Sequence, residues 1–101
     1  MEIEDRLIEH DAVAVASIVG VPDDKYGEEL GCFIELREGR SRPSEDELRS
    51  FVREKLARFK APRYFWWLKG DNDKVPSEWP KTTSGKISKP DLRKLVVDKL
   101  M

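Results

Sequence analysis

Residues 80–87, near the end of the chain, combine the residue types that could do chemistry. The segment reads Pro-Lys-Thr-Thr-Ser-Gly-Lys-Ile, with Gly85 directly before Lys86. Because glycine has no Cβ, another backbone or a ligand can approach closely at Gly85. Lys86 then presents a compact ammonium on a flexible stem, which suits it to bind phosphate or carboxylate oxygens as a point charge. The segment predicts either an anion-binding loop or a solvated surface turn whose lysine binds nothing.

Two other chemistries fit this segment less well. A phosphate-binding P-loop needs a glycine where this chain has Pro80, and a Ser or Thr where it has Ile87. Thr83 and Ser84 have no base beside them in the sequence that would activate a hydroxyl as a nucleophile, so we expect both to shape the loop.

The other chemistry-bearing side chains stand apart from one another. His10, the single histidine, follows a predicted short helix without an acid or cysteine at ligand spacing, so we expect a C-terminal cap and no metal site. Cys32, the single cysteine, lies on the apolar face of a predicted strand and is expected in the core. One cysteine excludes a disulfide framework and favours a reducing cytoplasm.

Length and composition indicate one small folded domain. A chain of 101 residues can bury a single modest core, and 39% hydrophobic residues argue against disorder. No apolar run approaches the ~18 residues of a membrane span, so none is expected. The net charge of −1 argues against a general nucleic-acid binder.

Charge is distributed unevenly along the chain. Residues 1–52 hold 6 Lys and Arg against 14 Asp and Glu, a net charge of −8, whereas residues 53–101 hold 13 against 6, a net charge of +7. Either the C-terminal half meets an anionic ligand or partner, or the asymmetry only reflects solvated faces.

The elements that must position residues 80–87 follow from periodicity and turn residues. Residues 2–10 indicate a short helix, residues 12–21 a central strand with two apolar faces, and residues 30–36 a strand with one buried face. The connection between these strands, with a turn at residues 22–24, is too short for a crossover helix. We therefore expect an antiparallel pair.

The middle of the chain predicts a helix and a third strand. A capping box at Ser44 and Glu47 opens the helix, whose apolar residues continue at helical spacing over 48–59 until Pro62 stops it. The bulky aromatic residues 64–68 indicate a strand.

The last part of the chain predicts an irregular polar loop over residues 69–78 and a final helix. Ser88 and Asp91 form a second capping box, Pro90 stands in the first turn, and the apolar pattern continues to Leu100. The order is therefore αββαβα, an α+β fold with a small, mostly antiparallel three-stranded sheet flanked by helices.

Three tryptophans are informative about packing. Trp66 and Trp67 point to opposite faces of their predicted strand, so one should be core and the other can be exposed, where it would suit a partner interface. Trp79 directly precedes Pro80, and we expect it to pack at the root of the Lys86 loop.

Four stretches, in order and spacing, resemble the C-terminal domain of the adenylate-forming acyl-CoA synthetases, the AMP-binding ligases. The resemblance covers essentially the whole chain, 1–101, but only the small C-terminal lid domain of a much longer enzyme, so we expect the N-terminal catalytic domain and the hinge to be absent. The stretches are Ile3-Glu4-Asp5-x-Leu7, Val19-Gly20-Val21-Pro22-Asp23 with Gly27-Glu28, Arg58-Phe59-Lys60-Ala61-Pro62-Arg63, and Pro80-x-x-x-x-Gly85-Lys86-Ile87.

The resemblance implies a reaction and a role for Lys86. The family converts a carboxylic acid, such as those of fatty-acid metabolism, and ATP into acyl-AMP and pyrophosphate, and then transfers the acyl group to CoA. Lys86 matches the lysine that enters the N-terminal domain and bridges the substrate carboxylate and the α-phosphate, while Gly85, Ser84 and Thr83 match the loop around it. ATP and Mg²⁺ would bind mainly to the missing N-terminal domain, and this chain alone would be inactive.

Further expectations concern CoA and regulation. Arg53 matches a basic residue that contacts a CoA phosphate in some relatives, and Arg58, Lys60 and Arg63 extend the positive charge, although a solvated helix face is the alternative. The motif around Lys86 also resembles the pattern that protein acetyltransferases recognise on several acyl-CoA synthetases.

Alternatives to the CoA ligase remain open at the level of sequence. A sister family transfers the acyl group to a carrier-protein thiol. A stand-alone module could reuse the fold and dock on a protein through an exposed tryptophan, or bind a nucleotide or nucleic acid through a basic face. The chain also departs from the family because residues 69–79 form a longer connection than relatives have, which leaves the place of the Lys86 loop to the structure.

Overall fold

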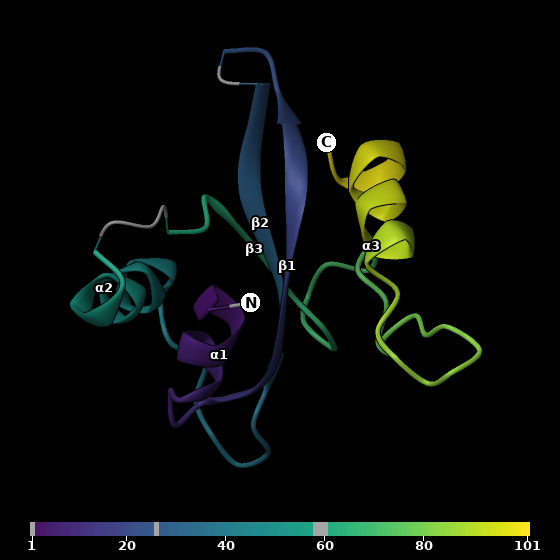
Figure 1. Cartoon of the computed structure of the whole chain (residues 1–101). Helices are drawn as coiled ribbons and strands as arrows, with labels where there is room; N and C mark the ends of the chain where they lie inside the picture. Colours follow the sequence, from purple (N-terminus) through teal and green to yellow (C-terminus); the bar gives the residue numbers. More distant parts are fainter. Residues whose placement is uncertain (1, 26, 58–60) are drawn as a thin grey trace.

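The chain folds around a three-stranded sheet that has helices on both faces (Figure 1). The computed structural model describes residues 2–25, 27–57 and 61–101. The α+β class and the order αββαβα are confirmed. The elements are α1 (Glu2–Ile8), β1 (Val13–Asp23), β2 (Gly27–Leu36), α2 (Glu45–Lys55), β3 (Tyr64–Trp67), α3 (Lys89–Leu95) and a π-helical turn (Val96–Leu100) that continues α3.

The sheet has the order β1-β2-β3 and contains one antiparallel and one parallel pairing. β1 and β2 pair antiparallel along their lengths because a short hairpin joins them. β3 pairs parallel with residues 31–34 of β2, because α2 crosses over between these two strands. The mostly antiparallel sheet expected from the sequence is therefore confirmed, with the parallel pairing confined to short β3.

The helix ends differ from the expected ones for local reasons. α1 ends at Ile8 and not at residue 10, because the N–H groups of Glu9 and His10 bond three residues back and tighten the last turn. α2 ends at Lys55 and not near residue 59, because Leu56 leaves the helical region at φ −124° while its N–H still bonds back into the helix.

The two strands of the first hairpin extend further than expected, and the turn between them is correspondingly shorter. β1 continues through Pro22 to Asp23, and β2 begins at Gly27 and not at Leu30. β1 is an edge strand and not the central strand expected from its two apolar faces, which are apolar because α1 and α3 cover them from opposite sides. Pro22 is tolerated at this edge, where a missing N–H costs no ladder bond on the outer side.

Two apolar clusters lie on opposite faces of the sheet. The first cluster joins α1 and α2 to one face, and the second cluster joins α3 and its π-helical turn to the other, as the arrangement in Figure 1 shows. β2 contributes to both, because its successive side chains alternate between the faces. The first cluster contains Ile3, Leu7, Val13, Ala16, Ile18, Cys32, Ile34, Leu48, Val52, Phe65 and Trp67. The second contains Val19, Val21, Phe33, Leu68, Val75, Leu92 and Val96.

Cys32 is a core residue, as expected. Its side chain is fully buried in the first cluster. Burial raises the pKa of the Cys32 thiol far above its usual range, because the thiolate would lose its hydration there. The thiol therefore stays protonated and inert in the folded chain.

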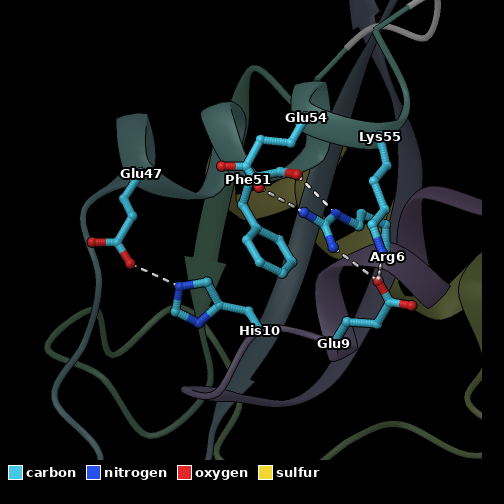
Figure 2. A network of polar contacts seen from close by, with 7 residues as sticks. All are labelled: Arg6, Glu9, His10, Glu47, Phe51, Glu54 and Lys55. Atoms are coloured by element: carbon cyan, nitrogen blue, oxygen red, sulfur yellow. Dashed lines mark hydrogen bonds and ion pairs between the residues drawn. The ribbon is translucent and has the colours of Figure 1, made fainter.

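Arg6 on α1 holds this helix against α2 (Figure 2). Its guanidinium carbon lies 3.5 Å from the ring centroid of Phe51, and its Nε donates to the Phe51 carbonyl at 2.8 Å. The terminal nitrogens pair with Glu9 and Glu54 at 2.9 Å each. The Arg6 side chain is only 8% exposed, so its stem packs in the interface while the head is satisfied on all sides.

His10 adds a second contact between the same elements, and it differs from the expected helix cap. Its Nδ1 accepts the Ala12 N–H at 3.0 Å, and its Nε2 lies 2.7 Å from Glu47 Oε2 (Figure 2). The ring meets Phe51 edge to face at 4.9 Å. His10 does not cap α1, because the carbonyls of Arg6 and Leu7 already accept backbone N–H groups. Its ring instead stabilises the turn after the helix.

We expect Arg6→Met to lower the free energy of unfolding by about 1–3 kcal/mol, because the Phe51 carbonyl loses its charged donor. The bridges to the exposed Glu9 and Glu54 contribute little to this figure. Urea denaturation of the chain measures the change. Arg53→Met on the exposed side of α2 is the matched control and should stay within about 0.5 kcal/mol. Equal stability of both variants would contradict the role of Arg6.

Candidate functional site

Lys86 lies near the tip of a small hairpin formed by residues 80–87. Lys81 and Ile87 form an isolated antiparallel bridge. Beyond the bridge, the Thr82 N–H donates to the Lys86 carbonyl at 2.8 Å. These bonds close the segment on itself, so the tip is held by its own hydrogen bonds.

The turn at the tip depends on Gly85 and on hydroxyl groups. Gly85 has φ +85°, a left-handed conformation that residues with a Cβ rarely adopt, and its N–H donates to the Thr82 carbonyl at 2.9 Å. Thr82 Oγ1 lies 2.9 Å from Ser84 Oγ and accepts the Lys86 N–H at 3.3 Å. Thr83 makes no hydrogen bond to the part of the chain that the structure describes. Thr82, which the sequence analysis did not single out, is the central hydroxyl of this turn.

Lys86 presents its ammonium to solvent. The residue is exposed, and its Nζ has no hydrogen bond or ion pair with any described residue. The positive charge is therefore not neutralised within the described parts of the chain and can meet an anionic group on another molecule or domain.

One side of the hairpin base is attached to the sheet by Trp79. The half-buried indole packs against the second cluster, and its Nε1–H donates to Glu35 Oε1 at 2.7 Å. The expectation that Trp79 packs at the root of the Lys86 loop is confirmed. The sequence reasoning missed Glu35, which looked like a solvent-facing residue of β2, because its partner lies 44 residues away.

The other side of the hairpin base leads directly into α3. Ile87 packs against the second cluster, and the Ser88 N–H donates to the Pro80 carbonyl at 2.8 Å. Ser88 is the N-cap of α3, as predicted, and its Oγ accepts the Asp91 N–H at 3.4 Å.

The start of α3 is also held to α1 and β1. Lys89 Nζ pairs with Glu4 Oε2, which accepts the Ile18 N–H at 2.7 Å. Burial alone would raise the pKa of Glu4, but the hydrogen bonds from Lys89 and Ile18 hold it below the usual value. This contact therefore stabilises the chain above the pKa of an unfolded Glu, and the stabilisation is lost as pH falls through the lowered pKa.

The longer connection after β3 folds against the core. Lys69 adopts a left-handed conformation with φ 59°, and the chain then returns so that Val75 is buried in the second cluster. The Val75 N–H donates to the Asn72 carbonyl at 3.1 Å. The extra residues thus bring Trp79 back to the sheet beside β2.

The remaining predicted site residues are dispersed. Arg53 is exposed near the end of α2, and exposed Arg63 lies with its guanidinium carbon 5.6 Å from the Tyr64 ring centroid. Arg58 and Lys60 lie outside the described residues. Within the described ranges, no three His, Cys, Asp or Glu side chains group as metal ligands.

No tryptophan of the described chain is fully exposed. Trp67 is buried in the first cluster, whereas Trp66 is half-buried on the opposite face, as the alternation predicts. Trp66 stacks on Tyr64 with ring centroids 5.6 Å apart. A docking module built on an exposed tryptophan therefore has no such residue in the described ranges.

Comparisons with known proteins agree with this geometry. Residues 2–86 match the family model described as the AMP-binding enzyme C-terminal domain. The chain belongs to that family. It is similar to the acyl-CoA ligase sidI of Aspergillus fumigatus, with 48% identity over 99% of this chain and 17% of the relative.

Solved structures show the same relationship. An acyl-CoA synthetase of Brucella canis superposes with a TM-score of 0.81 and 33% identity, over 99% of this chain and 17% of the other. The ATP-bound RpMatB-BxBclM chimera B1 superposes with a TM-score of 0.77 and 29% identity, over 99% and 19%. The chain thus spans about a sixth of the length of these AMP-binding relatives. Among its described residues, no helix is long and apolar enough to cross a membrane.

We expect Gly85→Ala to destabilise the hairpin by about 1 kcal/mol, because an L-residue with a Cβ is strained in the left-handed region. Gly85→Asn should cost less, since asparagine tolerates that conformation. Gly39 has φ +81° and equally open surroundings, so Gly39→Ala is the matched control with the same backbone strain away from Lys86. Exchange of the Thr82 amide proton should accelerate only in the Gly85 variant. An unchanged Thr82 amide in Gly85→Ala would contradict the proposed turn.

Proposed function

We propose that this chain is the mobile C-terminal domain of an ATP-dependent carboxylic acid–CoA ligase and supplies Lys86 to acyl-adenylate formation. The observation that carries the proposal is an exposed ammonium with no partner among the described residues, held at the tip of a hairpin whose base is fixed to the sheet. Family membership and the similarity to acyl-CoA ligases support the reaction class.

The chemistry explains why a lysine suits this position. When a carboxylate attacks the α-phosphate of ATP, negative charge builds on the oxygens of the transferring nucleotidyl group. A cation that is already in place in a site without water stabilises this charge at little reorganisation cost. The exposed hairpin would deliver Lys86 into such a site on the N-terminal domain, and a later domain rotation would withdraw it before CoA attacks.

The ligands of the full enzyme would be divided between its domains. The described residues offer no carboxylate cluster for Mg²⁺, so we assign Mg²⁺, ATP and the carboxylic acid mainly to the N-terminal domain. Exposed Arg53 is our candidate contact to a CoA phosphate. The buried protonated thiol of Cys32 is compatible with a reducing compartment, and we propose the cytoplasm.

Lys86→Ala in the enzyme that carries this chain should slow adenylation by about 10²–10³-fold, because a transition-state charge loses its stabilising cation. Thioester formation from supplied acyl-AMP should change little. Pyrophosphate exchange measures the first half-reaction, and acyl-CoA formation from acyl-AMP measures the second. Lys81→Ala, at the base of the same hairpin, is the control and should leave both intact.

Two outcomes would count against this assignment. Equal losses in both half-reactions would remove the specific role of Lys86 in adenylation. Acyl transfer to a carrier-protein thiol in preference to CoA would show that the proposed acceptor, CoA, is wrong. The 101-residue chain alone should show neither activity, and its stability should change by less than about 0.5 kcal/mol in Lys86→Ala.

We further expect Lys86 to be the preferred acetylation site of this chain. Its ammonium is exposed on a turn that projects from the fold, and acetylation would remove the charge that adenylation requires. Incubation with a protein acetyltransferase and acetyl-CoA, followed by peptide mass spectrometry, identifies the modified residue. The preference would be refuted by no labelling at Lys86, or by even labelling of Lys60, Lys69, Lys74, Lys81 and Lys86.

A further inference from the structure

We propose that Trp79 and Glu35 form a positioning pair that sets the direction of the Lys86 hairpin relative to the sheet. Neither residue is expected to touch the substrate. The pair would act through the base of the hairpin, and the inference rests on the proposed role of Lys86 in adenylation.

Trp79 and Glu35 share a short, partly buried hydrogen bond. The Trp79 Nε1–H donates to Glu35 Oε1 at 2.7 Å, and both side chains are half-buried. A hydrogen bond to a carboxylate is stronger than one between neutral groups, and partial burial shields it from competing water. The bond therefore fixes both the place and the rotation of the indole on β2.

The hairpin of residues 80–87 is attached to the rest of the fold at its base. The hydrogen bonds of its tip, residues 82–86, join only residues of the hairpin itself within the described chain. The tip consequently moves with its base as one unit. On the side that leads in from residues 69–78, the base is attached through Trp79.

A displacement at the base of the hairpin is enlarged at its tip. A small rotation of Trp79 also shifts the bridge between Lys81 and Ile87, because the ring of Pro80 restricts the backbone that connects them. The Lys86 ammonium stands beyond the bridge on a flexible side chain, so the displacement grows toward it. Catalytic groups that are misplaced by about 1 Å can lose about a hundredfold in rate. A fixed base therefore matters for delivery of the charge.

Trp66 provides a matched comparison on the same face of the sheet. It also packs against the second cluster, but its indole N–H donates to no described residue. Trp66→Phe and Trp79→Phe thus remove similar apolar surface, whereas only the second removes a hydrogen bond at the hairpin base. A purely packing role for Trp79 predicts the same behaviour for both.

The attachment can be tested on this chain without any catalytic assay. Trp79→Phe and Glu35→Ala should each accelerate exchange of the Ser88 amide proton at the hairpin base by about tenfold, while the Thr82 amide inside the tip and the Leu56 amide in α2 stay unchanged. Glu35→Gln keeps an acceptor oxygen and should restore slow exchange. An unchanged Ser88 amide in Trp79→Phe, or the same acceleration in Trp66→Phe, would overturn the positioning pair.

The consequence for catalysis is tested in the enzyme that carries this chain. Trp79→Phe and Glu35→Ala should each lower kcat of adenylation by about tenfold, with KM for ATP and for the acid unchanged, because binding belongs to the other domain. The double variant should be no slower than either single variant, since both remove the same bond. In Trp79→Phe and Glu35→Ala, the rate of thioester formation from acyl-AMP should stay within about twofold of the parent rate. In Glu35→Gln and Trp66→Phe, kcat of adenylation should also stay within about twofold.

The outcomes separate this inference from the proposed function. If Lys86→Ala leaves adenylation intact, the proposed function fails, whereas the exchange experiment still decides whether the pair holds the hairpin. If Lys86→Ala abolishes adenylation but Trp79→Phe matches Trp66→Phe in both assays, the positioning pair fails and the proposed function stands. Additive losses in the double variant would also overturn the pair.

Discussion

The structure depends on the burial of β2 from both sides. β1 and β3 flank it in the sheet, and its successive side chains, among them Phe33 and Ile34, enter opposite apolar clusters. Such a strand is stable only if helices cover both faces, because either face left open would expose apolar surface to water. The distribution of helices, with α1 and α2 on one face and α3 on the other, follows from this requirement.

The hairpin that carries the exposed Lys86 is attached to the buried core only through its base, among the described residues. The tip of the hairpin is held by hydrogen bonds between its own residues, so it can remain in solvent without losing its shape. What connects it to the core is confined to the base, where Trp79 and Ile87 pack on the second cluster. A segment built in this way can present a charged group to another domain while the sheet keeps its direction constant.

The charge asymmetry of the chain is partly resolved within the fold. Lys89 pairs with Glu4, and Arg93 Nη2 lies 3.2 Å from Glu28 Oε2, so cations of the C-terminal half neutralise acids of the N-terminal half. These contacts join α3 to α1 and β2. Lys86 differs from Lys89 and Arg93 because no described acid pairs with it. What distinguishes Lys86 is its exposed place near the tip of the hairpin, and not the excess of basic residues in its half of the chain.

Local signals in the sequence predicted most of the fold. The capping boxes at Ser44 and Ser88 marked the starts of α2 and α3, and the short connection after β1 predicted the antiparallel pair correctly. The ends of the helices were less accurate, because α1 tightens and α2 stops at Leu56 without a sequence signal of the strength of Pro62. Helix ends depend on which backbone groups find other partners, and a local pattern does not contain that information.

The sequence by itself determined the order of the elements, the residues of the Lys86 motif and the turn that Gly85 permits, because each depends on neighbours along the chain. Only the tertiary structure decided that Glu35 receives the indole of Trp79 and that Arg6 stacks on Phe51. These partners lie 44 and 45 residues apart in the chain. A glutamate on a strand and an arginine on a helix look like solvated residues until the fold brings a donor or a ring beside them. Contacts between distant residues arise from packing, and packing is a property of the whole chain.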